Sequence, residues 1–165
     1  MKEAAEKLYK ELLDDIEKIG HQYSQREKAL DKFTKELEEF NERIKNKVQS
    51  LVFLIESKDS EEYKALYAQN LPFMEVALPY LKDVAEYYDV RITYRNAVNK
   101  MNEEIIVKVR DADEDNMEEF VGDVRKIMRD WFDELDYLAS QVNDQMKVVF
   151  EDQKIVAEIY NSMLQ

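Results

Sequence analysis

Apolar side chains recur at alternating intervals of three and four residues along most of this chain. Such spacing places them on one stripe of an α-helix. The first repeat runs from Ala5 to Leu54 and predicts a helical rod over residues 2–57. Arg26 and Lys47 occupy in-register positions of this repeat, where a charge weakens packing locally and helps to fix register or partner choice.

The first repeat stops at the segment ESKDSEEY, where we expect the chain to turn back. Ser60 or Asp59 can accept a backbone N–H as the N-cap of a new helix, which predicts a short helix over residues 60–70. The following segment, NLPFMEVALPY, predicts a corner, because Pro72 suits the first turn of a helix whereas Pro79 would kink one.

The helical repeat returns over residues 72–110 and again over residues 115–164. Three apolar stripes joined by short corners bury one another best in a bundle. We therefore predict an all-α fold, an elongated antiparallel three-helix bundle with coiled-coil-like seams and a short extra helix at one end. The length is about that of one domain, so residues 1–165 are expected to form a single domain.

One part of the second rod also fits a different structure. The segments YDVRITY and EIIVKVR alternate apolar and polar residues and are rich in β-branched side chains, as strands are. A hairpin of residues 90–94 with 105–109 is therefore an alternative. We favour a helix, because the intervening sequence has no Gly or Pro for a turn and keeps the helical spacing.

Composition favours helices and suggests where the protein resides. Two glycines and two prolines among 165 residues are too few for the tight turns of β or doubly wound α/β folds. Cysteine is absent, which removes disulfides and thiolate sites and fits a reducing compartment. The amino terminus lacks the apolar core of a signal peptide, and the longest apolar run, Leu51–Ile55, is too short to span lipid. We expect a cytoplasmic protein.

The charge of the chain indicates which partners it can bind. The formal net charge is -13, and residues 113–165 hold 14 acidic but only 5 basic side chains. Such a surface repels nucleic-acid phosphates and anionic membranes and favours basic partners. We predict no direct binding to nucleic acid or to a membrane, and a protein partner that is basic or helical.

Three alternating aspartates in VRDADEDNMEEFVG resemble the start of a calcium loop of the EF-hand type. With Asp111 as the first position, however, the sharp turn that needs glycine falls on Asn116, and the closing glutamate is replaced by Gly122. A simpler interpretation is a helix start, with Asp115 as N-cap and Glu118 completing a capping box. We predict no metal site and no cofactor.

Catalytic constellations are missing from the sequence. His21 is the only histidine, so a site with two imidazoles is excluded, and Gly20 and Gly122 are too far apart for a phosphate-binding loop. No Glu-x-x-His pair occurs for a carboxylate-bridged metal centre, and Asp152, an acid on the third seam, is expected to be exposed. We predict that the protein is not an enzyme.

Tyrosine and arginine mark the best candidate contact surface. The segment EYYDVRITYR gathers both residue types, which are enriched in binding hot spots, and RDWFDELDY adds a second cluster. The alternative is that the tyrosines pack inside and the arginines pair with Glu86, Asp89 or acids of the third rod. Trp131 is assigned to the core. The predicted partner contacts are Tyr88, Arg91, Arg95 and Phe132.

Two functions fit these observations. The first is a non-enzymatic protein–protein interaction module, such as a scaffold, an adaptor or a chaperone-like helical rod. The second is an acidic inhibitor or nucleic-acid mimic that occupies the basic cleft of a nucleic-acid-binding protein. A homodimer also fits, because charged seam residues such as Lys108 can mark an edge that pairs with another copy. The acidic face of the second hypothesis comprises Asp113, Glu114, Glu118, Glu119, Asp123, Asp130, Asp133, Glu134 and Asp136.

Overall fold

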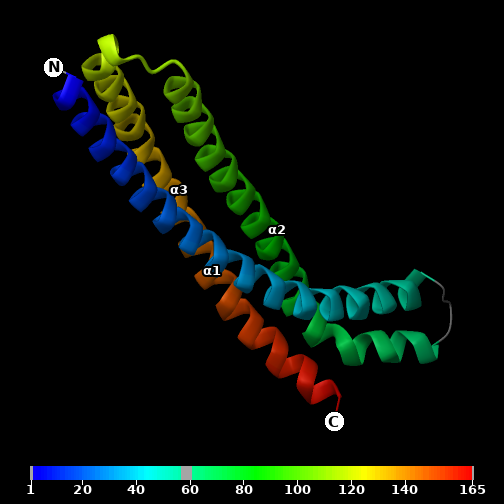
Figure 1. Ribbon diagram of the computed structural model, residues 1–165. Coiled ribbons are helices and arrows are strands. Elements are labelled where there is room, and N and C mark those ends of the chain that lie inside the picture. The colour runs from blue at the N-terminus through cyan, green and yellow to red at the C-terminus, as the bar shows by residue number, and fades with distance from the viewer. Residues whose placement is uncertain (1, 57–60, 165) are drawn as a thin grey trace. The chain divides into compact units, whose positions relative to one another are not determined.

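The computed structural model describes residues 2–56 and 61–164, and these residues form an all-α bundle (Figure 1). In chain order the elements are α1 (Lys2–Glu56), α2 (Glu61–Arg110), the short 3₁₀ helix η1 (Glu114–Asn116) and α3 (Met117–Met163). The predicted all-α fold and its three long segments are confirmed. No strand occurs in the described residues, so the hairpin alternative for residues 90–94 and 105–109 is wrong. Unbroken helical spacing outweighs β-branched composition there.

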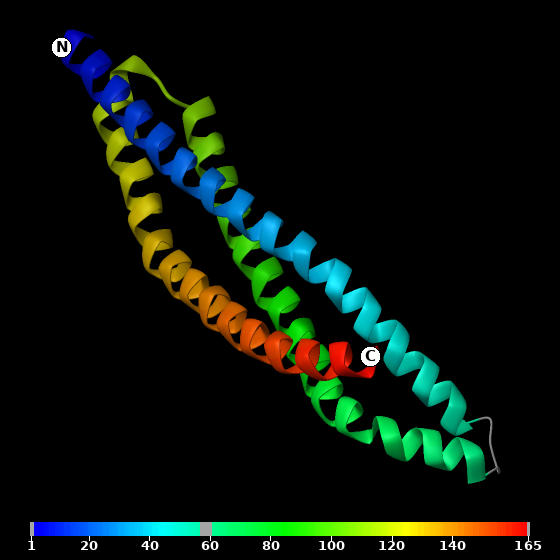
Figure 2. The ribbon, with the colours of Figure 1, turned by 90° about the horizontal axis from the view of Figure 1, so that it is seen from below.

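Helix α2 is longer at its start than the sequence predicts. The predicted separate helix over residues 60–70 is wrong, because α2 runs from Glu61 through Pro72 and Pro79 without a break. Proline lacks an N–H and crowds the carbonyl four residues earlier, so it bends a helix that packing holds together on both sides. Figures 1 and 2 show α2 changing direction in this stretch. The predicted N-caps Asp59 and Ser60 lie outside the described residues.

The described chain divides into two compact units, and each long helix contributes to both. Unit 1 contains the chain up to Lys32 together with Arg91–Ser140. Unit 2 contains Phe33–Val90 together with the chain from Gln141 onward. The single-domain prediction remains a prediction.

In unit 1, α1 and α3 run in the same direction and α2 runs the opposite way (Figure 2). The rings of Tyr9 in α1 and Phe120 in α3 lie 6.1 Å apart between centroids. Residues of the predicted seams form the interior, including Leu12, Met101 and Leu135, which are almost completely buried. The apolar stripes therefore pack as their spacing predicts.

Unit 2 has a core in which aromatic rings meet edge to face. Phe40 of α1 packs against Tyr80 of α2 with ring centroids 5.8 Å apart, and Phe33 contacts Tyr87 at 5.3 Å. Such offset geometry is favoured by the ring quadrupoles. Tyr80 and Tyr87 are fully buried, so these tyrosines act as core residues.

A 3₁₀ turn precedes the third long helix, and α3 itself begins at Met117, two residues later than expected. The carboxylate of Asp113 accepts a hydrogen bond from the backbone N–H of Asp115 at 3.4 Å, and η1 leads directly into α3. The prediction that Asp115 is the N-cap is therefore wrong, because the extra 3₁₀ turn moves the unpaired N–H groups back to Asp113. This loop and the amino-terminal end of α1 lie at the same end of unit 1 (Figure 1).

Candidate functional site

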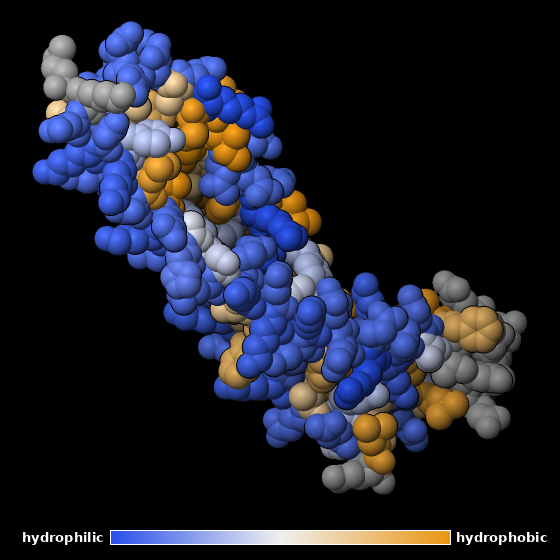
Figure 3. All heavy atoms as spheres, viewed as in Figure 1, coloured by the Kyte–Doolittle hydropathy of each residue, from blue (hydrophilic) through white to orange (hydrophobic). Residues whose placement is uncertain are grey.

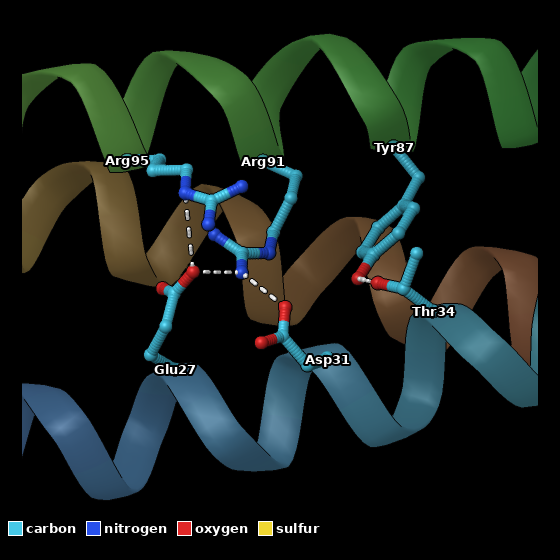
Figure 4. A network of polar contacts seen from close by, with 6 residues as sticks. All are labelled: Glu27, Asp31, Thr34, Tyr87, Arg91 and Arg95. Atoms are coloured by element: carbon cyan, nitrogen blue, oxygen red, sulfur yellow. Dashed lines mark hydrogen bonds and ion pairs between the residues drawn. The ribbon is translucent and has the colours of Figure 1, made fainter.

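Arg91 and Arg95, two of the predicted partner contacts, meet the same carboxylate in unit 1. Arg91 donates to Glu27 of α1 through Nη2, and the same nitrogen lies 3.1 Å from Oδ1 of Asp31 (Figure 4). Arg95 lies one helical turn further along α2, with its Nε 3.4 Å from Oε1 of Glu27. The pairing acids come from α1 and were not foreseen from the sequence.

The two arginines differ in burial, which separates their roles. The side chain of Arg91 is only 7% exposed, whereas that of Arg95 is 60% exposed. A buried guanidinium needs paired carboxylates to offset its lost hydration. Arg91 therefore ties α2 to α1 from inside the unit, and Arg95 remains available at the surface.

The neighbouring tyrosines belong to unit 2. The Tyr87 hydroxyl shares a hydrogen bond of 2.9 Å with the hydroxyl of Thr34, in which either oxygen can donate (Figure 4). Tyr88 is half-buried, and burial, followed by the charge of Glu38 and the proximity of Tyr87, raises the pKa of its phenol. Tyr88 therefore keeps a partly accessible neutral ring, and its role as a partner contact remains a prediction.

A groove of about 290 Å³ lies beside Arg95, between α1 and α2 of unit 1. We call it the Gly20 groove. Helix α1 lines it with Gly20, Tyr23, Ser24 and Glu27, and α2 lines it with Tyr94, Arg95, Val98, Asn99 and Asn102. Hydroxyl, amide, carboxylate and guanidinium groups thus surround a partly apolar hollow.

Tyr23 in this groove is held as a neutral phenol. Burial, with smaller contributions from Tyr94 and Asp136, raises the pKa of Tyr23 to about 12, although Arg26 lowers it slightly. Arg26 donates from Nη1 to the Tyr94 hydroxyl at 3.1 Å, and its guanidinium carbon lies 6.0 Å from the centre of that ring. The seam position of Arg26 is therefore used for a cation–π and hydrogen-bond contact.

Both glycines of the chain line grooves of unit 1, and sequence reasoning missed this. Gly20 lies inside α1, and Gly122 lies inside α3 in a second groove. Neither has a positive φ angle, and a Cβ built at either position meets no atom within 4 Å. Glycine inside a helix costs about 0.5–1 kcal/mol relative to alanine. The signal was present in the sequence, since both glycines interrupt helical repeats in a glycine-poor chain.

Replacing either glycine with alanine should therefore stabilise the protein. We expect Gly20→Ala and Gly122→Ala each to raise the free energy of unfolding by about 0.5–1 kcal/mol, because the helix gains propensity and the methyl group enters open space. Urea unfolding followed by circular dichroism measures the change. A destabilised alanine variant would mean that the backbone at that position needs glycine for a structural reason.

Trp131 and Phe132 are only partly buried in unit 1. The indole N–H of Trp131 donates to Oε2 of Glu104 at 2.9 Å, so the assignment of Trp131 to the core is correct only in part. Phe132 lines the groove at Gly122, where its exposed edge can meet a partner. Apolar residues also gather over the carboxy-terminal turns of α2, where Ile106 and Val107 are about half exposed (Figure 3).

The proposed acidic face is exposed but mixed in charge. All nine of its carboxylates are exposed, as the nucleic-acid mimic requires. However, Asp123 lies 3.8 Å from the ammonium of Lys108, and helical spacing places Lys126 and Arg129 among the acids of α3. These cations interrupt the row of negative charge.

A pair of carboxyl groups in unit 2 contradicts one expectation. Asp152 was expected to be exposed, but it is half-buried and its carboxyl shares a hydrogen bond with Asp83. Burial, the hydrogen bond to Asp83 and the charges of Asp83 and Glu151 raise the pKa of Asp152 to about 6. Asp152 occupies a seam position of α3, and residues at these positions face the interior, so its side chain is partly buried.

The described residues contain no group of three or more His, Cys, Asp or Glu side chains arranged to hold a metal ion. None of the helices in the described chain combines the length and apolarity needed to cross a membrane. The fold and the grooves together define a helical bundle with surface hollows on unit 1. Comparisons with protein-family models, curated proteins and solved structures find no match to this chain.

Proposed function

We propose that this chain is a non-enzymatic protein–protein interaction module of the cytoplasm, a scaffold, adaptor or chaperone-like bundle that binds a helical partner through unit 1. The observation that carries the proposal is the Gly20 groove, where Tyr23, Tyr94 and Arg95 line one hollow. Tyr and Arg are the residue types most enriched among side chains that dominate binding energy.

The side chains of the Gly20 groove are pre-organised for binding. The Glu27 carboxylate is fixed by buried Arg91 and in turn holds the side chain of Arg95 near the groove. An ordered arginine loses less rotamer freedom on binding, which favours affinity. Gly20 leaves room for a partner side chain to approach the backbone of α1.

A catalytic function has less support from the same residues. Ser24 lines the groove, but the one histidine of the chain, His21, lies outside it, so the serine lacks an imidazole base. The acidic inhibitor or nucleic-acid mimic is the second candidate, favoured by the nine exposed carboxylates and weakened by the interspersed cations.

The interaction function can be tested by capturing partners from a lysate of the source organism with wild-type protein and two variants. We expect Gly20→Trp, which fills the groove, and Arg95→Glu each to reduce the captured partner at least tenfold. The partner should resist washing in high salt, because apolar contacts are weakly screened. Arg43→Glu is the matched control, since Arg43 is an exposed arginine of unit 2.

Three outcomes would contradict this proposal. Equal capture by wild type, Gly20→Trp and Arg95→Glu would remove the groove from the interaction. Loss of a basic partner at moderate salt, together with its loss on charge reversal of Glu118, Glu119 and Asp123, would favour the mimic. Failure to capture any partner would count against both.

A further inference from the structure

A second groove of unit 1 lies between the parallel helices α1 and α3 and has a volume of about 450 Å³. We call it the Gly122 groove. Its apolar lining includes Ile19 of α1 and Met128 and Phe132 of α3. Gly122 opens it, because the missing side chain leaves empty space above the backbone of α3. The volume falls within the range of about 300–1,000 Å³ that is common for ligand sites.

The rim of the Gly122 groove is basic, although the chain has a net charge of -13. Lys18, Arg125 and Arg129 line it against a single acid, Asp15. Arg125 Nη2 lies 3.4 Å from Asp15 Oδ2, but both side chains are about half exposed, so this pair is weak. Lys18 and Arg129 have no carboxylate within 4 Å in the part of the chain that the structure describes.

Apolar lining and a basic rim together select for an acidic, amphipathic ligand. An amphipathic helix lays residues at positions i, i+3 or i+4, and i+7 into a hollow of this kind. Met128 is adaptable in shape and polarisable, which suits it to accept different apolar side chains. Carboxylates flanking those side chains would meet the unpaired ammonium and guanidinium groups of Lys18 and Arg129.

We propose that the Gly122 groove binds an acidic amphipathic helix of a partner protein. The apolar side chains of that helix fill the space above Gly122 and contact Phe132, and its carboxylates pair with Lys18, Arg125 and Arg129. A second copy of this chain is a poorer occupant, because the apolar seams of its helices are already buried in its own bundle. The inference deepens the interaction function and rests on it, but it uses a separate groove.

The test is a selection from a displayed library of helical 20-residue peptides with randomised surface positions, using the full chain as bait. We expect the enriched peptides to be net acidic and to carry an apolar stripe at helical spacing. Their Kd should rise at least tenfold on Gly122→Trp, which fills the groove, and on Arg129→Glu. Gly20→Trp is the matched control and should bind them as wild type does, because it fills only the other groove. Increasing salt should weaken binding.

The alternative results are distinguishable. Enrichment of neutral or basic peptides, equal binding to wild type and Gly122→Trp, or no enrichment would overturn the proposal. Concentration-dependent self-association that disappears in Gly122→Trp, measured by sedimentation, would make a second copy the occupant and would also overturn it. Circular dichroism checks that each variant folds. If Gly122→Trp does not fold, the binding of Arg129→Glu decides the outcome. If Gly20→Trp and Arg95→Glu did not reduce partner capture, that result would count only against the Gly20 groove and not against peptide binding in the Gly122 groove.

Discussion

Replacing Arg91 with alanine is expected to lower the free energy of unfolding by about 2–3 kcal/mol, because it leaves the Glu27 and Asp31 carboxylates without their internal partner. Breaking a fully buried ion pair costs about 3–5 kcal/mol, and the partial exposure of both acids reduces this value. The melting temperature should fall by roughly 4–12 °C in a chain of this size. Thermal and urea unfolding followed by circular dichroism measure both quantities.

Arg95→Ala is the matched control for this prediction. It removes the same residue type from the same helix and from the same carboxylate, but its side chain is 60% exposed. An exposed pair contributes about 0–1 kcal/mol, so we expect a loss below about 0.5 kcal/mol. If Arg91→Ala were no more destabilising than Arg95→Ala, burial of the guanidinium would not be what holds α2 against α1 in unit 1.

Replacing Asp152 with asparagine is expected to stabilise the protein at pH 8 and to leave its stability nearly unchanged at pH 4. Burial and Asp83 raise the pKa of Asp152 from 3.8 to about 6, so the folded protein binds more protons than the unfolded chain between these values. Its stability therefore falls as the pH rises from about 4 to about 6 and stays lower above that range. Asparagine has no such ionisation.

The expected gain of Asp152→Asn at pH 8 is about 1 kcal/mol, because the partial exposure of Asp152 screens much of the cost of its charge. Urea unfolding at intervals from pH 4 to pH 8 measures the difference from wild type. Asp144→Asn, at an exposed position of α3 in unit 2, is the control and should give no comparable pH-dependent gain. A gain that is equal at pH 4 and pH 8 would show that ionisation is not its cause.

The helices could be predicted because their cause is periodic and local. Residues such as Ile44, Val124 and Val149 recur at helical spacing, and all three are fully buried. The spacing could not predict that α2 continues through Pro72, because the cost of a proline is set against packing from elements distant in sequence. Interpreting the prolines without the surrounding packing therefore led to two predicted helices where the structure has one.

The candidate site was less predictable than the fold. The clustering of tyrosine and arginine identified Arg91 and Arg95 as candidate contact residues. It could not assign one to the interior and the other to the surface. That difference depends on Glu27 and Asp31, which face α2 only after α1 has packed in unit 1. Grooves also lie beyond sequence periodicity, because a hollow such as the one at Gly122 is defined by side chains from two helices.

The interleaved composition of the two units has a consequence for folding kinetics. Unit 2 includes one continuous stretch, Phe33–Val90, in which contacting residues such as Phe40 and Tyr80 are closer in sequence than Tyr9 and Phe120 of unit 1. Unit 1 joins two distant stretches and needs pairs such as Tyr9 and Phe120, whose closure costs more chain entropy. We therefore expect the contacts between α1 and α2 of unit 2 to be formed in the folding transition state and the Tyr9–Phe120 contact to form after them. Because each unit consists of two separate stretches of the chain, no single cut in the backbone can yield either unit as one continuous polypeptide.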